Sequence, residues 1–292
     1  FGRAARRLNM AQPPLSQSIQ RLEAELGVTL IDRSHRAVQL TPPGQVFLNE
    51  ARRTLQQAEL ARVATRRAAS TMPEVHISII GPALYQFLPP FLAGYHAEET
   101  GISVRLHEQS SADQIKGMLA GKFDLGFVSA GTGWPDEFDH VIVERSQVVA
   151  LVPASSQLAG KAKVKLAELA EQPFILPPQR HSAHILDMLS VFKNEGNVPN
   201  VVQESLQTNT TMTLVSAGLG CSLVCNSAIT VAPPNLCFIP LDLASGTLEF
   251  QLAMVWLRNC PNDHAVRLIA RAKAFLAKNP QFLDPEALLP AP

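Results

Sequence analysis

The sequence has only four cysteines, and they do not form the pairs that disulfide-rich or zinc-binding proteins carry. Cys221, Cys225, Cys237 and Cys260 include no C-x-x-C pair. His264 lies near Cys260 in the chain, but no second pair of ligands accompanies them, so we expect no metal site and no cofactor. The cysteines are expected to be buried free thiols in a reducing compartment.

Catalytic and membrane-spanning signatures are also missing. The chain has no G-x-S-x-G nucleophile elbow, no phosphate-binding P-loop and no G-x-G-x-x-G motif, so we predict no catalytic residues and no enzyme activity. No apolar run reaches the ~20 residues that span a bilayer, and no signal peptide opens the chain. We therefore expect a cytoplasmic protein that has no membrane partner.

Lysine is missing from the first 70 residues, whereas arginine is abundant there. This segment holds 11 Arg and 5 acidic residues, which gives it a net charge of +6. Because the formal net charge of the whole chain is 0, the remaining 222 residues carry −6. An arginine-only basic segment on a neutral chain favours phosphate contact by that segment. The alternative is an ordinary solvated helical surface.

Residues 13–26 have two unlike faces. Apolar residues recur at spacings of four, three and four, which predicts one apolar stripe of a helix: Leu15, Ile19, Leu22 and Leu26. Uncharged hydrogen-bonding side chains fall on the other face, and such groups can read base edges in a major groove: Gln12, Ser16, Gln17 and Gln20. Pro13 suits the first helical turn, and Gly27 suits the position just past the end. A short helix at 2–8 and a turn at 9–11 precede it, so the segment is a predicted helix-turn-helix.

A basic hairpin and a long helix follow. Strand candidates at 29–31 and 37–40 enclose a tip with Arg33 and Arg36, which predicts a wing. Thr41 and Pro42 then begin a helix that runs to about residue 69. Its apolar residues follow a near-heptad spacing in a narrow seam: Phe47, Ala51, Leu55, Ala58 and Ala61. Such a seam needs a partner, either a second copy of the chain or the following domain.

Beyond a hinge at 70–73, strand and helix patterns alternate. This alternation predicts an α/β domain, which we expect to contain two parallel sheets. Strands are expected at 75–80, 102–107, 123–128, 141–143, 148–152, 174–176, 201–204, 221–224 and 255–257. Helices are expected at 82–99, 112–120, 185–195, 212–218 and 265–277.

A series of ordered motifs runs through the whole chain. Those near the amino terminus are Ala4-Ala5-x-x-Leu8, Gln12-Pro13-Pro14-Leu15-Ser16, Ile19-x-x-Leu22-Glu23-x-x-Leu26-Gly27, Leu30-Ile31-Asp32-Arg33 and Val38-x-Leu40-Thr41-x-x-Gly44. Later ones are Leu88-Pro89, Leu119-x-x-Gly121-x-x-Asp124-Leu125-Gly126-Phe127 and the run 214–220. Together they resemble the pattern of LysR-type transcriptional regulators, and the resemblance covers essentially all 292 residues.

The resemblance implies a multi-domain fold. It has an all-α winged helix-turn-helix DNA-binding domain (1–41), a linker and dimerisation helix (42–70), and an α/β effector domain like periplasmic binding proteins (74–292). The effector domain would have lobe I (74–145 and 251–292) and lobe II (146–250). A homodimer or homotetramer, double-stranded promoter DNA and RNA polymerase are the implied partners. Since the family has a further helix before the position of Phe1, we expect the sequence to begin inside the DNA-binding domain.

The resemblance also places two sites. The helix at 13–26 would enter a major groove, with contacts from Gln12, Pro13, Ser16, Gln17 and Gln20, while Arg33 and Arg36 hold the backbone or the adjoining minor groove. A small effector would bind between the lobes, at the carboxyl ends of strands.

The effector site would begin with the loop Gly81-Pro82-Ala83, which opens into a helix whose free N–H groups favour an anion. An organic acid is therefore the expected effector. Pro82 supplies neither a hydroxyl nor an N–H group where many relatives have Ser or Thr. Other strand ends would add Ser111, Ser129, Ser182, His184, Thr208 and Asn209. His184 could pair with a carboxylate or be an ordinary surface histidine.

Two other functions stay open at this point. A solute-binding protein of the periplasmic type would suit the second part of the chain, but it would carry a signal peptide and lack the arginine-only helix-turn-helix. A regulator that needs no effector would act by occupying DNA alone. Ligand-induced thermal stabilisation would distinguish it from an effector-dependent regulator.

Overall fold

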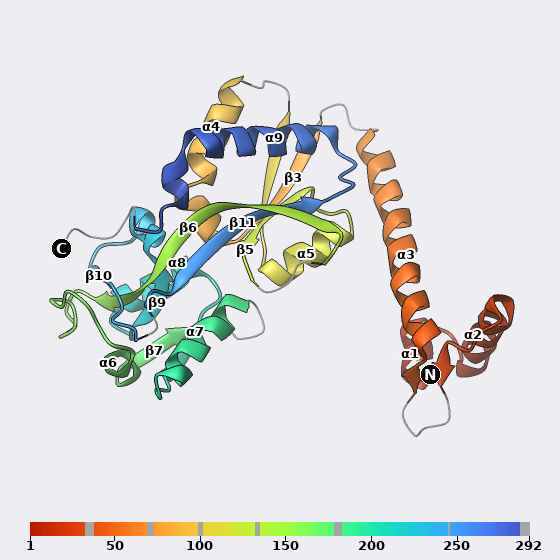
Figure 1. Ribbon diagram of the computed structural model, residues 1–292, viewed down its shortest axis with the longest axis horizontal. Coiled ribbons are helices and arrows are strands. Elements are labelled where there is room, and N and C mark those ends of the chain that lie inside the picture. The colour runs from red at the N-terminus through yellow and green to blue at the C-terminus, as the bar shows by residue number, and fades with distance from the viewer. Residues whose placement is uncertain are drawn as a thin grey trace. The chain divides into compact units, whose positions relative to one another are not determined.

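The computed structural model describes residues 1–32, 38–68, 73–98, 102–131, 135–177, 183–244 and 246–286. The chain forms two compact units, residues 1–62 and 63–292, whose helices and strands are drawn in Figure 1. Within the described ranges, no helix is long and apolar enough to cross a membrane.

The first unit contains the predicted helix-turn-helix and hairpin. Helix α1 (Gly2–Arg7) and helix α2 (Gln12–Leu26) are followed by strands β1 (Ile31–Asp32) and β2 (Gln39–Leu40), which pair antiparallel. Gly27 ends α2 in the left-handed conformation (φ 69°), as its position predicts. Helix α3 (Pro42–Ala68) begins where Thr41 predicts, because the Thr41 hydroxyl oxygen accepts a hydrogen bond from the Gly44 N–H at 3.0 Å.

Contacts between α2, β1 and α3 hold this unit together. One Glu23 carboxylate oxygen accepts hydrogen bonds from the N–H groups of Leu30 (2.8 Å) and Ile31 (3.0 Å). Leu30 is 5% exposed, and its carbonyl oxygen lies against the backbone of Gly44. The entry into the hairpin is therefore fixed from both sides, by a side chain of α2 and by the first turn of α3.

The second unit is built on one seven-stranded mixed sheet. Strands β3 (Glu74–Ile79), β4 (Ser103–Glu108) and β5 (Leu125–Ser129) are parallel, with β3 in the middle. Strand β11 (Glu249–Leu257) runs antiparallel to β5 and to β6 (Phe138–Pro153). The far end of β6 pairs antiparallel with β9 (Ser222–Cys225) and β10 (Leu236–Ile239).

This topology corrects the expectation of two parallel sheets. The predicted strands at 141–143 and 148–152 are parts of the single strand β6, which joins the two ends of the sheet. The polar run between them resembles a loop in the sequence, yet Glu144 and Ser146 are 0% and 1% exposed and the run pairs with β11. A separate two-stranded parallel sheet is formed by β7 (Pro173–Leu176) and β8 (Asn200–Glu204).

Helices cover both faces of the large sheet. Helices α4 (Leu88–Glu98) and α9 (Asp263–Lys278) lie on one face and α5 (Ser111–Leu119) on the other, as Figure 1 shows. Around the other end of β6 lie α6 (Leu166–Ala170), α7 (Ala183–Asn194) and α8 (Thr208–Ser216). Short 3₁₀ helices complete the unit: η1 (Gly81–Leu84), η3 (Asn226–Val231) and η4 (Pro280–Leu283).

The continuous helix expected at 82–99 is wrong. The segment consists of η1, a turn at 85–87 and then α4. Pro89 and Pro90 explain the break, because a proline ring clashes with the carbonyl group four residues earlier and cannot donate to it. Both prolines are tolerated in the first turn of α4, where no such bond is needed.

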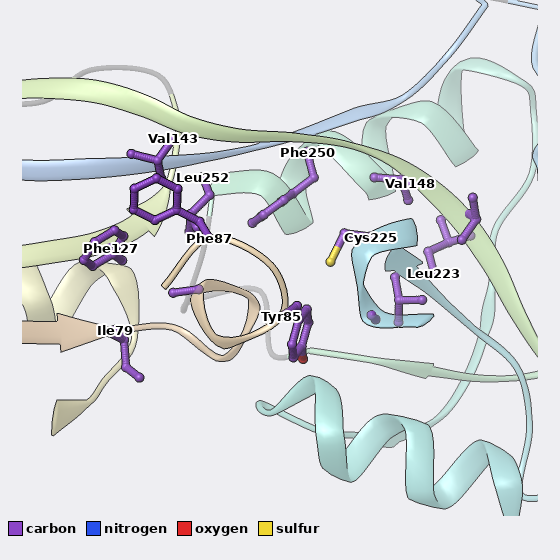
Figure 2. Close-up of a cluster of buried hydrophobic side chains, with 14 of the residues drawn as sticks. Ile79, Tyr85, Phe87, Phe127, Val143, Val148, Leu223, Cys225, Phe250 and Leu252 are labelled. Atoms are coloured by element: carbon purple, nitrogen blue, oxygen red, sulfur yellow. The ribbon is translucent and has the colours of Figure 1, made fainter. Parts of the chain in front are cut away.

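The core of the second unit is continuous from one lobe to the other. Phe87 is fully buried and contacts the rings of Phe91, Phe127, Phe275 and Phe282 at centroid distances of 5.6–6.0 Å. Figure 2 shows Phe87 and Phe127 on one side of Tyr85 and Leu223 and Cys225 on the other. Tyr85 therefore stands where the two lobes meet.

Candidate DNA-binding face and effector cavity

The faces of α2 differ in exposure as their sequence pattern predicts. Gln17 and Gln20 are exposed and Ser16 is half-buried, while Leu15, Ile19 and Leu22 are half-buried on the other side. The last residue of the predicted stripe departs from it, since Leu26 is 43% exposed next to the end of the helix at Gly27. The uncharged amide side chains are thus free to contact a ligand in solution.

The amino-terminal end of α2 is exposed at Gln12 and Pro13. No side chain caps this end and its first turn has no acidic residue, so it does not repel an anion. Because Pro13 and Pro14 have no N–H group, the Gln12 N–H is the one donor that the first three helical positions offer. Arg33 and Arg36 lie outside the described residues. The described part of the unit adds the exposed arginines Arg3, Arg6, Arg7 and Arg21.

A cavity of about 280 Å³ lies between the two lobes of the second unit. The ends of β3, β4 and β5 supply one wall, and the opposite wall comes from α7, the start of α8 and β9. Ligand pockets typically measure about 300–1,000 Å³, and this cavity lies just below the lower end of that range, so it suits a small molecule. Its described lining residues are Ile80, Gly81, Pro82, Glu108, Gln109, Ser110, Ser111, Asp113, Ser129, Pro177, Met188, Leu206, Gln207, Thr208, Leu223, Val224, Cys225 and Phe250.

Five of the residues expected at the effector site line this cavity: Gly81, Pro82, Ser111, Ser129 and Thr208. Ala83 does not, because its side chain is fully buried in the core beneath η1. Asn209 lies one residue beyond the wall, where its side-chain oxygen accepts a hydrogen bond from the Tyr85 hydroxyl at 3.4 Å. Ser182 lies outside the described residues, and His184 belongs to α7.

Hydrogen bonds connect the two walls, and one buried hydroxyl group has no hydrogen-bond partner among the described residues. The Thr230 hydroxyl of η3 donates to the Tyr85 carbonyl oxygen at 3.1 Å, so Tyr85 is bound to two elements of the other lobe. The Ser129 N–H donates to the Ser111 hydroxyl oxygen at 3.2 Å. The Ser129 hydroxyl itself is buried and has no hydrogen-bond partner among the described residues.

The sequence did not indicate several residues of the cavity wall. Phe250 comes from β11, more than 160 residues after the first wall segment at 80–82, so no local pattern connects the two. Met188 is on the buried side of α7 and has the spacing of an ordinary core residue. Glu108 ends β4, one residue past the predicted strand end, and its position at a strand's carboxyl end was the available signal.

Burial favours the neutral forms of three titratable groups at or behind the cavity, Cys225, Tyr85 and Glu144. Burial raises the pKa of the Cys225 thiol to about 12, and it also raises the pKa of the Tyr85 hydroxyl. On β6, burial raises the pKa of the Glu144 carboxyl, although hydrogen bonds with Ser146 and Ser227 lower this pKa in part. The described residues contain no group of three or more His, Cys, Asp or Glu side chains that could hold a metal ion.

Both units match families of known proteins. Residues 1–45 match the bacterial regulatory helix-turn-helix protein family of the lysR type, and residues 68–273 match the LysR substrate binding domain. The HTH-type transcriptional regulator AlsR of Bacillus subtilis (strain 168) is 35% identical over 258 residues, which are 87% of this chain and 84% of AlsR.

Solved structures agree in fold along nearly the whole chain. The crystal structure of CbnR, a LysR family transcriptional regulator, is 26% identical with a TM-score of 0.59, and the match covers 92% of this chain and 93% of CbnR. Full-length CbnR complexed with its target DNA is similar to this chain with a TM-score of 0.57 and 25% identity, covering 94% and 93%. The helix-turn-helix unit, the long helix and the two-lobed effector domain are therefore those of a bacterial regulator, and the chain belongs to the LysR family of DNA-binding transcriptional regulators, which are not enzymes.

Proposed function

We propose that this regulator reads promoter DNA with the polar face of α2 and that a small organic acid in the cavity between the lobes modulates this binding. The observation that carries the first part is the exposure of Gln17 and Gln20 on a helix whose apolar side is partly buried. An amide side chain can donate to and accept from adenine in the major groove, and each such bidentate contact contributes about 1–3 kcal/mol of discrimination.

Ser16, Gln12 and Pro13 lie at the amino-terminal half of the same face and would set the position of the helix against bases and phosphates. Arg33 and Arg36, at the tip of the predicted wing, would contact the phosphate backbone or the adjoining minor groove. These arginine contacts contribute affinity on every duplex and depend on salt, whereas the amide contacts depend on the base sequence.

The assembly that we propose is a homodimer formed through α3, within a homotetramer. Leu55, in the middle of the apolar seam of α3, is 72% exposed in the single chain, and Ala58 and Ala61 beside it are exposed as well. A helix of this length with an uncovered apolar seam is stabilised when a second helix packs against it. RNA polymerase is a further proposed partner of the bound regulator.

The domain boundaries that we propose are 1–41, 42–70 and 74–292, with lobe I at 74–145 and 251–292 and lobe II at 146–250. The lobes meet along β6 and β11, whose pairing shifts register between Leu252 and Ala253, opposite Glu144 and Ile142. An irregularity of this kind bends a strand, so it is the proposed hinge between the lobes. An acid that binds more tightly at one lobe angle than at the other shifts the protein towards that angle. The free energy of DNA binding can then change by at most the difference between the acid's binding free energies at the two angles, typically ~1–3 kcal/mol.

The test measures how the Gln17→Ala substitution changes binding to two DNA duplexes. A specific duplex is enriched from a random library by the full-length protein itself, and a scrambled duplex of the same composition is the reference. Gln17→Ala should weaken binding to the specific duplex by about 5- to 150-fold, which is ~1–3 kcal/mol, and change the scrambled duplex less than about twofold. Ser18→Ala is the matched control, because the Ser18 hydroxyl bonds to the Pro14 carbonyl oxygen within the helix.

If Gln17→Ala lowers the affinity for both duplexes equally, Gln17 does not read a base. For the effector, organic acids that raise the thermal unfolding temperature should also shift the affinity for the specific duplex. An acid that stabilises the protein but leaves this affinity unchanged would contradict its role as an effector.

A further inference from the structure

The polar groups of the cavity are distributed unevenly, and the distribution limits the acids that can bind. Among the described lining residues there is no Lys, Arg or His. The described part of the wall therefore offers an anion backbone N–H groups, hydroxyl groups and the positive end of a helix.

One such helix end is free. Helix α8 has nine residues and begins at Thr208, with no side chain capping its amino terminus and no acidic residue in its first turn. Gln207 and Thr208 line the cavity, so the first N–H groups of α8 lie at its wall. The comparable end of α5 is already satisfied, since the Ser110 hydroxyl oxygen accepts from the Asp113 N–H and Asp113 is an acidic residue in that first turn.

A buried hydroxyl at the same cavity also lacks a partner. Ser129 is 8% exposed, it lines the cavity at the end of β5, and its hydroxyl has no hydrogen-bond partner among the described residues. A buried polar group without a partner costs about 1–3 kcal/mol, which a ligand oxygen at this point would relieve. The α8 end and the Ser129 hydroxyl lie on opposite walls of the cavity, and each can donate a hydrogen bond to a carboxylate oxygen of a bound acid.

The mouth of the cavity has the opposite character. Glu108 is exposed there, and the carboxylate has no ion-pair or hydrogen-bond partner in the described part of the chain. Its oxygen lies 3.9 Å, and the Tyr85 hydroxyl 3.5 Å, from the point where a side chain on Gly81 would begin. Asp113 also lines the cavity, but its carboxylate is already bonded to Lys116 at 3.3 Å and to the Ser110 hydroxyl at 2.8 Å.

We propose that the cavity selects acids with a single carboxylate group and that Glu108 excludes acids with a second one. This inference rests on the proposed effector function of the cavity. A second carboxylate on a molecule that fits about 280 Å³ would stand near Glu108, with no cation in the described wall to compensate either charge. The repulsion between two unit charges about 6 Å apart near a protein surface weakens binding by several-fold or more.

The test uses two pairs of acids with matched carbon skeletons, pentanoate with pentanedioate and 3-methylbenzoate with benzene-1,3-dicarboxylate. Isothermal titration calorimetry on the full-length protein should show at least about fivefold tighter binding of a monocarboxylate than of its dicarboxylate partner. Glu108→Gln should reduce this ratio by about fivefold, chiefly by strengthening the dicarboxylate. Glu171→Gln is the matched control, because Glu171 is an exposed carboxylate of the same domain that does not line this cavity.

Ser129→Ala separates failure of this inference from failure of the proposed effector site. If dicarboxylates bind as tightly as monocarboxylates and Ser129→Ala weakens both, the effector site stands and the selection by Glu108 is overturned. A ratio that Glu108→Gln leaves unchanged overturns it as well. If neither member of either pair binds the wild-type protein, the proposed organic-acid effector fails, and the inference fails with it.

Discussion

Two glycine-to-alanine substitutions, one in each unit, test the packing within that unit. We expect one of them to lower the stability of its unit and the other to raise it. Gly44 is buried in the first turn of α3, and a Cβ atom there would stand 2.0 Å from the carbonyl oxygen of Leu30. Gly94 lies within α4, is exposed, and a Cβ atom there would meet nothing within 4 Å.

The magnitudes follow from these two distances. In Gly94→Ala the gain in helix propensity acts alone, so the second unit should become more stable by up to ~1 kcal/mol. In Gly44→Ala the same gain is outweighed by the overlap with a backbone atom, because Leu30 is fixed by the hydrogen bonds to Glu23 and cannot move aside freely. Overpacking costs ~1–3 kcal/mol, so the first unit should lose roughly 1–2 kcal/mol.

Two signals separate the units. The chain has two tryptophans, Trp134 and Trp256, and both belong to the second unit, so tryptophan fluorescence follows that unit. Gly94→Ala should raise its thermal midpoint by about 2–4 °C. Gly44→Ala should leave this midpoint unchanged, lower the first unit's midpoint measured by circular dichroism at 222 nm by about 5–15 °C, and weaken DNA binding. Unchanged stability of the first unit in Gly44→Ala would refute the described contact between α3 and Leu30.

Three further predictions concern the long helix, the buried carboxyl and the thiols. Leu55→Glu should dissociate the proposed dimer in sedimentation velocity, whereas Thr54→Glu should not, because the Thr54 hydroxyl bonds to the Glu50 carbonyl oxygen off the apolar seam; intact dimers of both variants would contradict the α3 interface. Burial raises the pKa of Glu144 above its unfolded value, so its ionisation costs stability at high pH, and the cost is relieved as the pH falls through the folded pKa. Glu144→Gln should therefore stabilise the second unit at pH 8 relative to wild type and lose this advantage towards pH 5; an advantage that does not change with pH would contradict the burial of a titrating carboxyl. Cys221 and Cys225, whose pKa values burial raises to about 12, should resist iodoacetamide at pH 8 until the protein unfolds, while the half-buried Cys237 and Cys260 react first; rapid labelling of Cys225 would contradict its burial.

Local signals in the sequence were sufficient for most of the helices and for the polar and apolar sides of α2. Pro13 and Gly27 mark the start and the end of α2 at residues 12–26. The spacing of Leu15, Ile19 and Leu22 identifies the half-buried side of this helix. These features depend on residues within one or two helical turns of each other, so the sequence contains the whole physical cause. The break in the expected helix at 82–99 also has a local cause, because Pro89 and Pro90 are incompatible with a helical turn directly before them.

The cavity between the lobes and the crossing strand β6 depend on contacts between distant segments. Glu144 and Ser146 resemble loop residues, and their burial follows from β11, which reaches β6 from more than 100 residues later in the chain. Phe250 and Glu108 meet at the same cavity for the same reason. Five of the residues that the family resemblance implied do line this cavity, whereas the absence of basic groups in the described wall could be seen only in three dimensions.

The central claim, that Gln17 reads a base through its amide group, can be tested by exchanging the chemistry of that side chain. An amide pairs with adenine, whereas arginine pairs with guanine. Duplexes enriched from a random library by wild type and by Gln17→Arg should therefore differ at one position of each half-site, where A·T becomes G·C, and agree elsewhere. Identical enriched sequences, or a uniform loss of preference at all positions, would contradict the account.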